Sequence, residues 1–221
     1  MRLLYGGTFD PVHEGHLAIA RSASLALGRP VHLLPAADPP HRAPPGASAA
    51  QRTTMLELAV GCDRRLCVDR RELQRSGPSF TIDTLAEVRA ELGPDVPLVW
   101  ILGIDSLRQL DDWRDWRRIF ALAHLLGVER PGTRIDAGWL QAQAPVVHAE
   151  LAPRWREAGA LAESAAGGYA ALPIEPLRTE SATEVRQRIA TGGDWDGMVP
   201  PAVARYIREQ GLYGALQARG V

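Results

Sequence analysis

Lysine is absent from this 221-residue sequence, so all 25 of its basic residues are arginines. A chain without lysine cannot form a lysyl–AMP intermediate or a Schiff base, and it cannot place a Walker-A lysine on a phosphate. Any phosphate site must therefore use arginine, histidine, hydroxyl groups, backbone N–H groups and the positive ends of helices.

Excess charge of either sign is also absent, because 26 acidic residues leave a net charge of −1. A surface that binds nucleic acid or an acidic membrane is therefore not expected. The longest apolar runs are far shorter than the roughly 18 residues that a membrane span requires, and the N-terminus lacks a signal-peptide stretch. We accordingly expect a cytoplasmic protein. The only two cysteines, Cys62 and Cys67, are expected to be buried or half-buried free thiols.

Short apolar segments alternate with segments of helical periodicity along most of the chain. Strands are expected at Arg2–Tyr5, Val31–Leu34, Leu66–Val68, Pro97–Leu102, His124–Val128 and Tyr169–Leu172, and helices at Gly15–Leu27, Ser48–Val60, Thr81–Leu92, Asp112–Phe120, Glu184–Ala190 and Ala202–Gln210. Ser48 and Gln51 have the spacing of a capping box, and residues 131–167 are expected to form loops with short helical pieces. This alternation predicts an α/β fold with a doubly wound parallel sheet. We expect one domain over residues 1–221, with a small helical C-terminal part from about residue 177 to residue 221.

The most informative segment is G-G-T-F-D-P-V-H-E-G-H-L, which spans residues 6–17 between the first expected strand and the first expected helix. Ligands of open parallel sheets bind beyond the carboxyl ends of the strands. Two glycines allow close approach of the backbone to a phosphate, and the helix N-terminus offers free N–H groups. His13 and His16 flank that helix start, so both can face an anion bound there.

The same segment argues against two common nucleotide sites and weakly suggests a metal. The G-x-G-x-x-G spacing of dinucleotide-binding oxidoreductases is missing, and so is the Walker-A pattern. The H-x-x-H spacing could bind a metal ion, but it lacks a glutamate base in the right frame and a clear third ligand. We therefore predict no metal held by protein ligands.

These residues resemble the nucleotidyltransferase α/β-phosphodiesterase superfamily, whose core pattern is (H/T)-x-G-H. S-A-T-E-V-R at residues 181–186 is similar to its C-terminal S-(S/A)-T-x-x-R motif. Within the superfamily, the chain looks most like the bacterial nicotinate-mononucleotide adenylyltransferase family over roughly residues 2–213. The supporting stretches are P-P-H-R at 39–42, P-S-F-T at 78–81, G-I-D-S-L at 103–107 with a tryptophan downstream, and E-R-P-G at 129–132.

The resemblance implies a Rossmann-like nucleotidyltransferase fold and transfer of AMP from ATP to nicotinic acid mononucleotide in NAD biosynthesis. The expected catalytic residues are His16, His13 and Arg186. The expected ATP-binding residues are Gly6, Gly7, Thr8, Phe9, His13, His16, Gly103, Asp105, Ser181, Thr183 and Arg186. Mg²⁺ is expected to arrive with the triphosphate, since no dedicated carboxylate cage is evident.

The acceptor is expected to contact Arg42, Thr81, Asp105, Trp113 and Arg130. Trp113 would stack on the pyridine ring. Thr81 would hydrogen-bond its carboxylate, cap the following helix, or do both, and Asp105 would accept from ribose hydroxyls or act as a plain helix cap. Arg42 and Arg130 would pair with the acceptor's phosphate or carboxylate.

Other functions remain open from the sequence. The same chemistry could act on nicotinamide mononucleotide or phosphopantetheine, or use CTP, although the P-P-H-R, P-S-F-T and tryptophan features argue against the last two. A non-catalytic nucleotide-binding regulator could share the fold, and so could an NAD-dependent oxidoreductase. Intact histidine and arginine motifs argue against the regulator, and the missing dinucleotide fingerprint argues against the oxidoreductase.

Overall fold

The computed structural model describes residues 1–37, 45–75, 77–129, 132–173 and 178–215. Its strands are β1 (Arg2–Gly7), β2 (Val31–Pro35), β3 (Leu66–Val68), β4 (Leu98–Gly103), β5 (His124–Val128) and β6 (Tyr169–Leu172). Its α-helices are α1 (Glu14–Leu27), α2 (Ala49–Val60), α3 (Thr81–Leu92), α4 (Ile104–Arg108), α5 (Ile119–Leu122), α6 (Ala137–Gln143), α7 (Pro145–Leu151), α8 (Ala182–Thr191) and α9 (Pro201–Glu209). The expected alternation of strands and helices is thereby confirmed, with most boundaries within two residues.

All strand pairs are parallel, and the described residues form one sheet in the order β3-β2-β1-β4-β5-β6. The chain moves outward from β1 to β3, returns to the middle at β4, and then moves outward on the other side to β6. The direction of winding therefore changes between β1 and β4, and ligands of such sheets bind at this switch point. The predicted doubly wound parallel sheet is confirmed.

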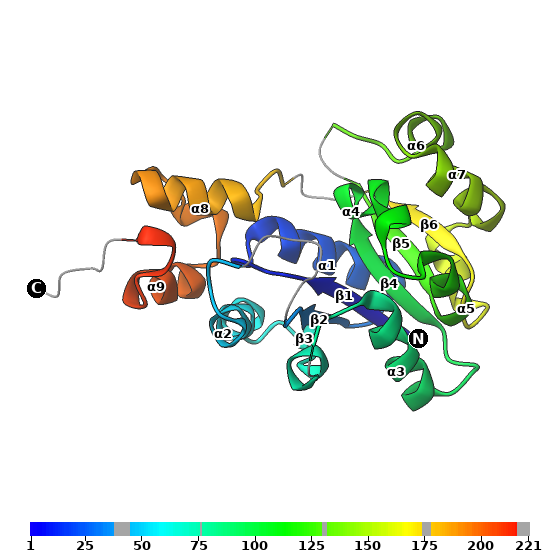
Figure 1. Cartoon of the computed structure of the whole chain (residues 1–221), viewed down its shortest axis with the longest axis horizontal. Coiled ribbons are helices and arrows are strands. Elements are labelled where there is room, and N and C mark those ends of the chain that lie inside the picture. The colour runs from blue at the N-terminus through cyan, green and yellow to red at the C-terminus, as the bar shows by residue number, and fades with distance from the viewer. Residues whose placement is uncertain (38–44, 76, 130–131, 174–177, 216–221) are drawn as a thin grey trace, which may run out of the picture.

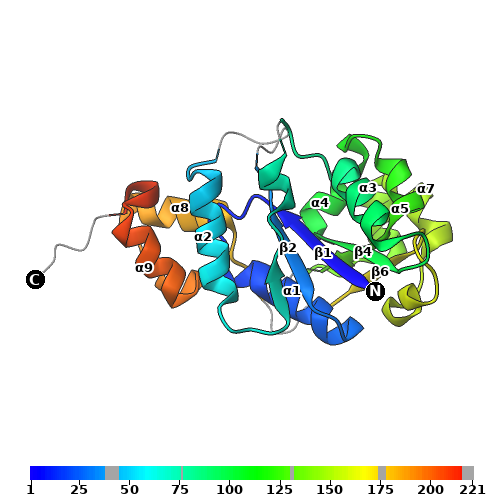
Figure 2. The same ribbon diagram turned by 90° about the horizontal axis from the view of Figure 1, so that it is seen from below.

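Alternate residues of the central strands pack into two cores, one on each face of the sheet. On β1, Leu3 and Tyr5 belong to the core that α1, α2, α8 and α9 complete, whereas Leu4 belongs to the core formed with α3, α5, α6 and α7. Figures 1 and 2 both show α2, α8 and α9 gathered at one end of the molecule, with α5 and α7 at the other.

Capping residues explain several helix ends. The Ser48 hydroxyl accepts from the backbone N–H of Gln51, and the Gln51 side chain accepts from the N–H of Ser48, so the predicted capping box begins α2. Ser181 caps α8 by accepting from the N–H of Glu184. Helices α1 and α8 end before Gly28 and Gly192, which adopt left-handed conformations that glycine tolerates well.

The expected continuous helix at Asp112–Phe120 is wrong. Two short 3₁₀ turns, η2 (Leu110–Asp112) and η3 (Trp116–Arg118), precede the four-residue helix α5. Trp113 is extended between the two turns, and Asp115 has a positive φ of 50°. Trp116 is buried in the core, whereas Trp113 lines a large cavity. A regular helix would place these two rings on the same side, one turn apart, so the chain breaks the helix between them.

One smaller expectation is corrected and another is confirmed. Cys62 is exposed rather than buried, although both cysteines are free thiols. Residues 132–167 do contain short helical pieces, namely α6, α7 and the 3₁₀ turns η4 (Ala152–Arg154) and η5 (Ala158–Ala162). In the described part of the chain, no helix is long and apolar enough to cross a membrane.

The helical C-terminal part begins with α8 and continues through η6 (Asp196–Met198) and α9 to the 3₁₀ turn η7 (Leu212–Gly214). Val203 and Ile207 of α9 are completely buried in the same core as Met55 of α2. Since α2 and α9 pack together, the C-terminal part is joined to the sheet domain through a shared hydrophobic core.

Candidate active site

A cavity of about 730 Å³ opens beyond the carboxyl ends of β1 and β4. Every predicted site residue within the described ranges lines it: Gly6, Gly7, Thr8, Phe9, His13, His16, Thr81, Gly103, Asp105, Trp113, Ser181, Thr183 and Arg186. These residues come from segments that are up to 180 positions apart in the numbering, and the fold brings them to the switch point of the sheet. The predicted Arg42 and Arg130 lie outside the described residues.

Two histidines lie at the start of α1. His13 is the N-cap residue and is only 5% exposed, whereas His16 is half-buried in the first turn. Their rings stack with centroids 3.7 Å apart, and the backbone N–H of His13 donates to Nδ1 of His16 across 3.3 Å. Because Nδ1 accepts this bond, a neutral His16 carries its proton on Nε2.

The His16 ring packs closely against the protein interior. Phe9 is 1% exposed and meets the His16 ring edge-on, with centroids 5.0 Å apart. A Cβ on Gly7 would lie 3.0 Å from the Phe9 ring, and one on Gly15 would lie 3.0 Å from Nδ1 of His13. These glycines therefore permit contacts that place the two imidazoles, and Phe9 is positioned to support His16 from the protein interior.

Arg186 approaches the same place from α8. Its Nη1 donates to the backbone carbonyl of Asp10 across 2.5 Å, and its Nη2 lies 3.5 Å from Oγ1 of Thr183. The ten-residue helix α8 also directs its N-terminus, capped by Ser181, to the cavity wall. A guanidinium, a helix N-terminus and two imidazoles thus converge on one space, which favours a polyanion.

Another part of the cavity wall carries the predicted acceptor residues that the structure describes, namely Thr81, Asp105 and Trp113. Thr81 is the first residue of α3 rather than its cap, because Phe80 occupies the N-cap position; the alternative of a Thr81 cap is wrong. Likewise Gly103, not Asp105, is the N-cap of α4. Trp113 is partly buried against the core that contains Leu4, and it also lines the cavity. The hydrophobic core therefore supports its ring.

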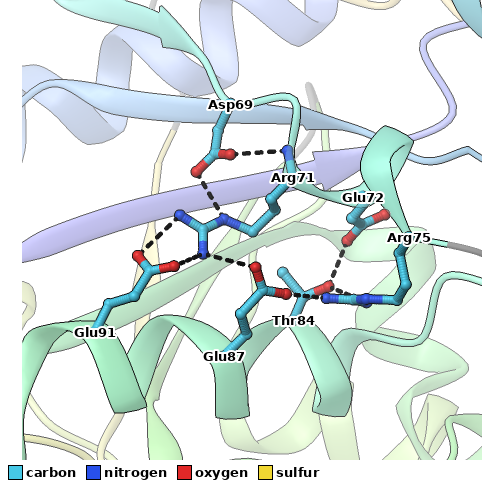
Figure 3. A network of polar contacts seen from close by, with 7 residues as sticks. All are labelled: Asp69, Arg71, Glu72, Arg75, Thr84, Glu87 and Glu91. Atoms are coloured by element: carbon cyan, nitrogen blue, oxygen red, sulfur yellow. Dashed lines mark hydrogen bonds and ion pairs between the residues drawn. The ribbon is translucent and has the colours of Figure 1, made fainter.

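A polar network lies behind this wall and joins the 3₁₀ turn η1 (Arg71–Gln74) to α3 (Figure 3). Glu72 is 4% exposed, lines the cavity, and accepts from Oγ1 of Thr84 across 2.8 Å. Burial raises the pKa of the Glu72 carboxyl, and the hydrogen bond from Thr84 opposes that shift. Arg71 meanwhile pairs with Asp69, Glu87 and Glu91. The network holds the two elements that flank Ser79 and Phe80 of the wall.

Sequence reasoning missed several residues of the cavity and its supports. Asp10 and Glu72 line the cavity as buried carboxyls, and Arg178 and Glu180 form an ion pair on its rim. Arg52 is 1% exposed on α2 and donates to the backbone carbonyl of Thr8 across 2.6 Å. Asp10 could have been found from its place inside the glycine-rich motif, but no sequence pattern distinguishes Arg52 from the other 24 arginines.

The chemistry available at this site is anion binding combined with directed hydrogen bonding. In the described ranges, no three His, Cys, Asp or Glu side chains gather so that they could hold a metal ion. Donors at fixed positions stabilise charge that grows in a transition state without needing to reorganise. The arrangement therefore suits transfer of a phosphorus group between two negatively charged partners.

Comparison with known proteins points to the same chemistry. The cytidylyltransferase-like family matches residues 4–188. A probable nicotinate-nucleotide adenylyltransferase of Stenotrophomonas maltophilia is 50% identical over 223 residues, covering 96% of each chain. A protein of the same description from Marinobacter nauticus is 42% identical and covers 100% of each chain.

Among solved structures, Plasmodium falciparum nicotinic acid mononucleotide adenylyltransferase complexed with NaAD superposes with a TM-score of 0.71. Its sequence is 18% identical, and the match covers 96% of each chain. At this identity the likeness concerns the fold alone, and it extends over nearly the whole chain.

Proposed function

Because the chain belongs to the nicotinate-nucleotide adenylyltransferase family, we infer that it transfers the AMP part of ATP to nicotinic acid mononucleotide. The products are nicotinic acid adenine dinucleotide and pyrophosphate, and the reaction belongs to NAD biosynthesis. The observation that carries this function is full-length similarity to these enzymes in a chain whose G-G-T-F-D-P-V-H-E-G-H motif lines the cavity at the switch point of the sheet.

In the proposed reaction, a phosphate oxygen of the acceptor attacks the α-phosphorus of ATP. The new O–P bond forms as the bond between the α-phosphorus and the bridging oxygen breaks, and pyrophosphate leaves with that oxygen. The attacking oxygen is already an anion, so no general base is required. The main barrier is the approach of an anion to a triphosphate, and catalysis depends on in-line positioning and electrostatic stabilisation.

We assign the triphosphate to the wall formed by α1 and α8. Nε2–H of His16 is the proposed donor to the α-phosphate, where negative charge grows in the transition state. His13 shares this contact or binds the β-phosphate, and Arg186 pairs with the β- and γ-phosphates. Gly6, Gly7, Thr8, Ser181 and Thr183 supply backbone N–H groups and hydroxyls around the chain of phosphates.

We assign the acceptor to the wall formed by α3 and Trp113. The indole ring of Trp113 is the proposed stacking surface for the pyridine, and the N-terminus of α3 at Thr81 faces its carboxylate. Asp105 is the proposed acceptor for ribose hydroxyls. Arg42 and Arg130 remain predictions for the acceptor's phosphate or carboxylate.

Mg²⁺ fits this proposal as a partner of the triphosphate. Asp10, a carboxylate at the cavity, already accepts from two backbone N–H groups and one hydroxyl, so it is poorly placed to serve as a metal ligand. The ion would be held mainly by phosphate oxygens and water, and it would neutralise charge on the leaving pyrophosphate. With ATP as its co-substrate, the enzyme is proposed to work in the cytoplasm.

The test is pyrophosphate release from ATP and Mg²⁺ in parallel reactions with nicotinic acid mononucleotide, nicotinamide mononucleotide and phosphopantetheine. Strong release with the nicotinate substrate, at least tenfold above the other two, is the expected result. Comparable release with both pyridine nucleotides would replace the proposal by a dual-specificity enzyme. Release only with phosphopantetheine, or with none of the three from folded protein, would overturn it.

A further inference from the structure

The buried carboxylate of Asp10 joins three parts of the molecule beside the cavity. Its Oδ2 accepts from the backbone N–H of Gly46 across 2.8 Å, and its Oδ1 accepts from that of Ala47 across 3.1 Å. The Tyr213 hydroxyl donates to the same Oδ1 across 2.7 Å. Asp10 thus connects the glycine-rich motif, the segment before α2 and the 3₁₀ turn η7 at the end of the described chain.

Arg186 is held by the same residue. Its Nη1 donates to the Asp10 carbonyl across 2.5 Å and lies 3.7 Å from Oδ2 of the Asp10 carboxylate. The Asp10 carboxylate is almost fully buried at 5% residue exposure, so water hardly screens this attraction. Arg186 itself lines the cavity, and its side chain remains 35% exposed there. The guanidinium is therefore anchored on one side and open to the cavity on the other.

The backbone conformation and the packing of Tyr213 fix its position. Its φ of 57° lies in the left-handed region, which an aromatic residue adopts only where its surroundings hold it. A Cβ on Gly46 would lie 3.0 Å from the Tyr213 ring and 3.7 Å from Cδ of Arg186, so Gly46 leaves room for both side chains. Burial and the neighbouring Asp10 carboxylate raise the pKa of Tyr213, so its hydroxyl keeps the proton that it donates.

We propose that Asp10 and Tyr213 are positioning residues for Arg186, and that the C-terminal turn η7 thereby sets the affinity of the site for the triphosphate of ATP. The hydroxyl of Tyr213 orients the Asp10 carboxylate, which in turn holds the guanidinium of Arg186 where it meets the phosphates. Neither Asp10 nor Tyr213 needs to touch the reacting atoms. This inference rests on the proposed function only in taking ATP as the ligand of the α8 wall.

The decisive variant is Tyr213→Phe, because it removes one hydroxyl and keeps the ring that packs beside Gly46. The matched control is Tyr206→Phe on α9, which removes a hydroxyl from the same C-terminal part; within the described residues, Asp10 accepts nothing from it. Binding of an ATP analogue with a methylene bridge between its α- and β-phosphates is measured by calorimetry without acceptor. Each variant is made in the parent protein and in an Arg186→Gln background, and thermal unfolding verifies that all are folded.

Tyr213→Phe is expected to weaken binding of the analogue about tenfold in the parent, the scale of one hydrogen bond to a charged group. In the Arg186→Gln background the same change is expected to weaken it less than twofold, since coupled residues give non-additive effects. Tyr206→Phe should leave binding unchanged in both. A purely structural role would give equal losses in the two backgrounds, and that result, or no loss in the parent, would overturn the proposal.

The proposed function and this inference fail in different ways. A parent protein that binds the analogue but forms no dinucleotide with nicotinic acid mononucleotide would contradict the function while leaving the coupling measurable. Asp10→Asn adds a second test, because it keeps an acceptor oxygen and removes the charge that faces Arg186. It is expected to weaken analogue binding more than Tyr213→Phe does, again only where Arg186 is present; an equal loss in the Arg186→Gln background would count against the proposal.

Discussion

The histidines His13, His16 and His124 occupy two different environments, the cavity wall and the buried core. His13 and His16 line the cavity at the start of α1, where the triphosphate is proposed to bind. His124 is completely buried, where its Nδ1 accepts from the backbone N–H of Gly168 and its Nε2 lies 2.8 Å from the carbonyl of Ser164. This pairing requires a neutral ring with its proton on Nε2, so His124 has a structural role.

His16→Ala is expected to lower kcat for pyrophosphate release by about two to three orders of magnitude, the usual scale for losing one transition-state donor. The loss should fall on kcat more than on the KM for ATP, because the contact strengthens as charge grows. Steady-state kinetics at saturating acceptor measure both. A loss of tenfold or less in a protein with unchanged thermal unfolding would remove His16 from the central role.

His124 is expected to make the protein less stable in mild acid. Burial lowers the pKa of His124 below its ordinary value of 6.5, so below that pH the unfolded state binds more protons than the folded state. The stabilising contribution is complete above pH 6.5 and declines as the pH falls below it. Urea unfolding at pH 7.5 and 5.5 should show a smaller difference for His124→Gln than for the parent; equal differences would contradict the assignment.

At the scale of elements, the ring of Trp100 on β4 covers Gly6 near the end of β1. A Cβ on Gly6 would lie 2.5 Å from two ring atoms of Trp100, a distance that no real contact allows. Trp100 is 3% exposed in the core under α3, so its ring has little freedom to move. The first glycine of the motif is therefore required for the packing of the Trp100 ring against β1.

Gly6→Ala is expected to lower the free energy of unfolding by about 1–3 kcal/mol, the usual cost of overpacking a core. Gly159→Ala is the matched control, because a Cβ there meets nothing within 4 Å. Chemical denaturation of both variants measures the difference. If Gly6→Ala were as stable as Gly159→Ala, the close approach of Trp100 would be wrong.

At the scale of the whole molecule, Arg52 joins its own helix start to two segments that lie earlier in the chain. Its guanidinium donates to the carbonyls of Thr8, Ala47 and Ala37 across 2.6, 3.3 and 3.1 Å. The residue is 1% exposed, and burial lowers the pKa of its guanidinium. A planar group with five fixed donors can satisfy three carbonyls in different directions, which explains why an arginine occupies the interior.

Arg52→Lys is expected to lower the free energy of unfolding by about 1–3 kcal/mol. The three carbonyls are bound by three different nitrogens of Arg52, and a single ammonium nitrogen cannot take all three positions. The exposed Arg205→Lys on α9 should change it by less than about 0.5 kcal/mol. Denaturant titrations compare the two substitutions. Equal effects would mean that the hydrogen bonds from the Arg52 guanidinium to the three carbonyls do not contribute to stability.

Local patterns in the sequence were sufficient for most of the secondary structure and for the site motifs. The period of the apolar residues, the glycines after α1 and α8, and the Ser48–Gln51 pair are signals between near neighbours, so they can be read from the chain without its fold. The same holds for the motif around His13 and His16, whose residues act within one turn.

Only the tertiary structure decided which distant residues meet. The helix expected after Leu110 is broken because Trp116 is buried in the core. Local helix propensity carries no information about that burial. Asp10, Arg52 and Tyr213 acquire their roles from hydrogen bonds that span 36 to 203 positions. The sequence by itself therefore determined the order of the elements and the chemistry of the cavity wall. The supports behind that wall depend on long-range contacts, because a buried charge is stable only where the folded chain supplies its partners.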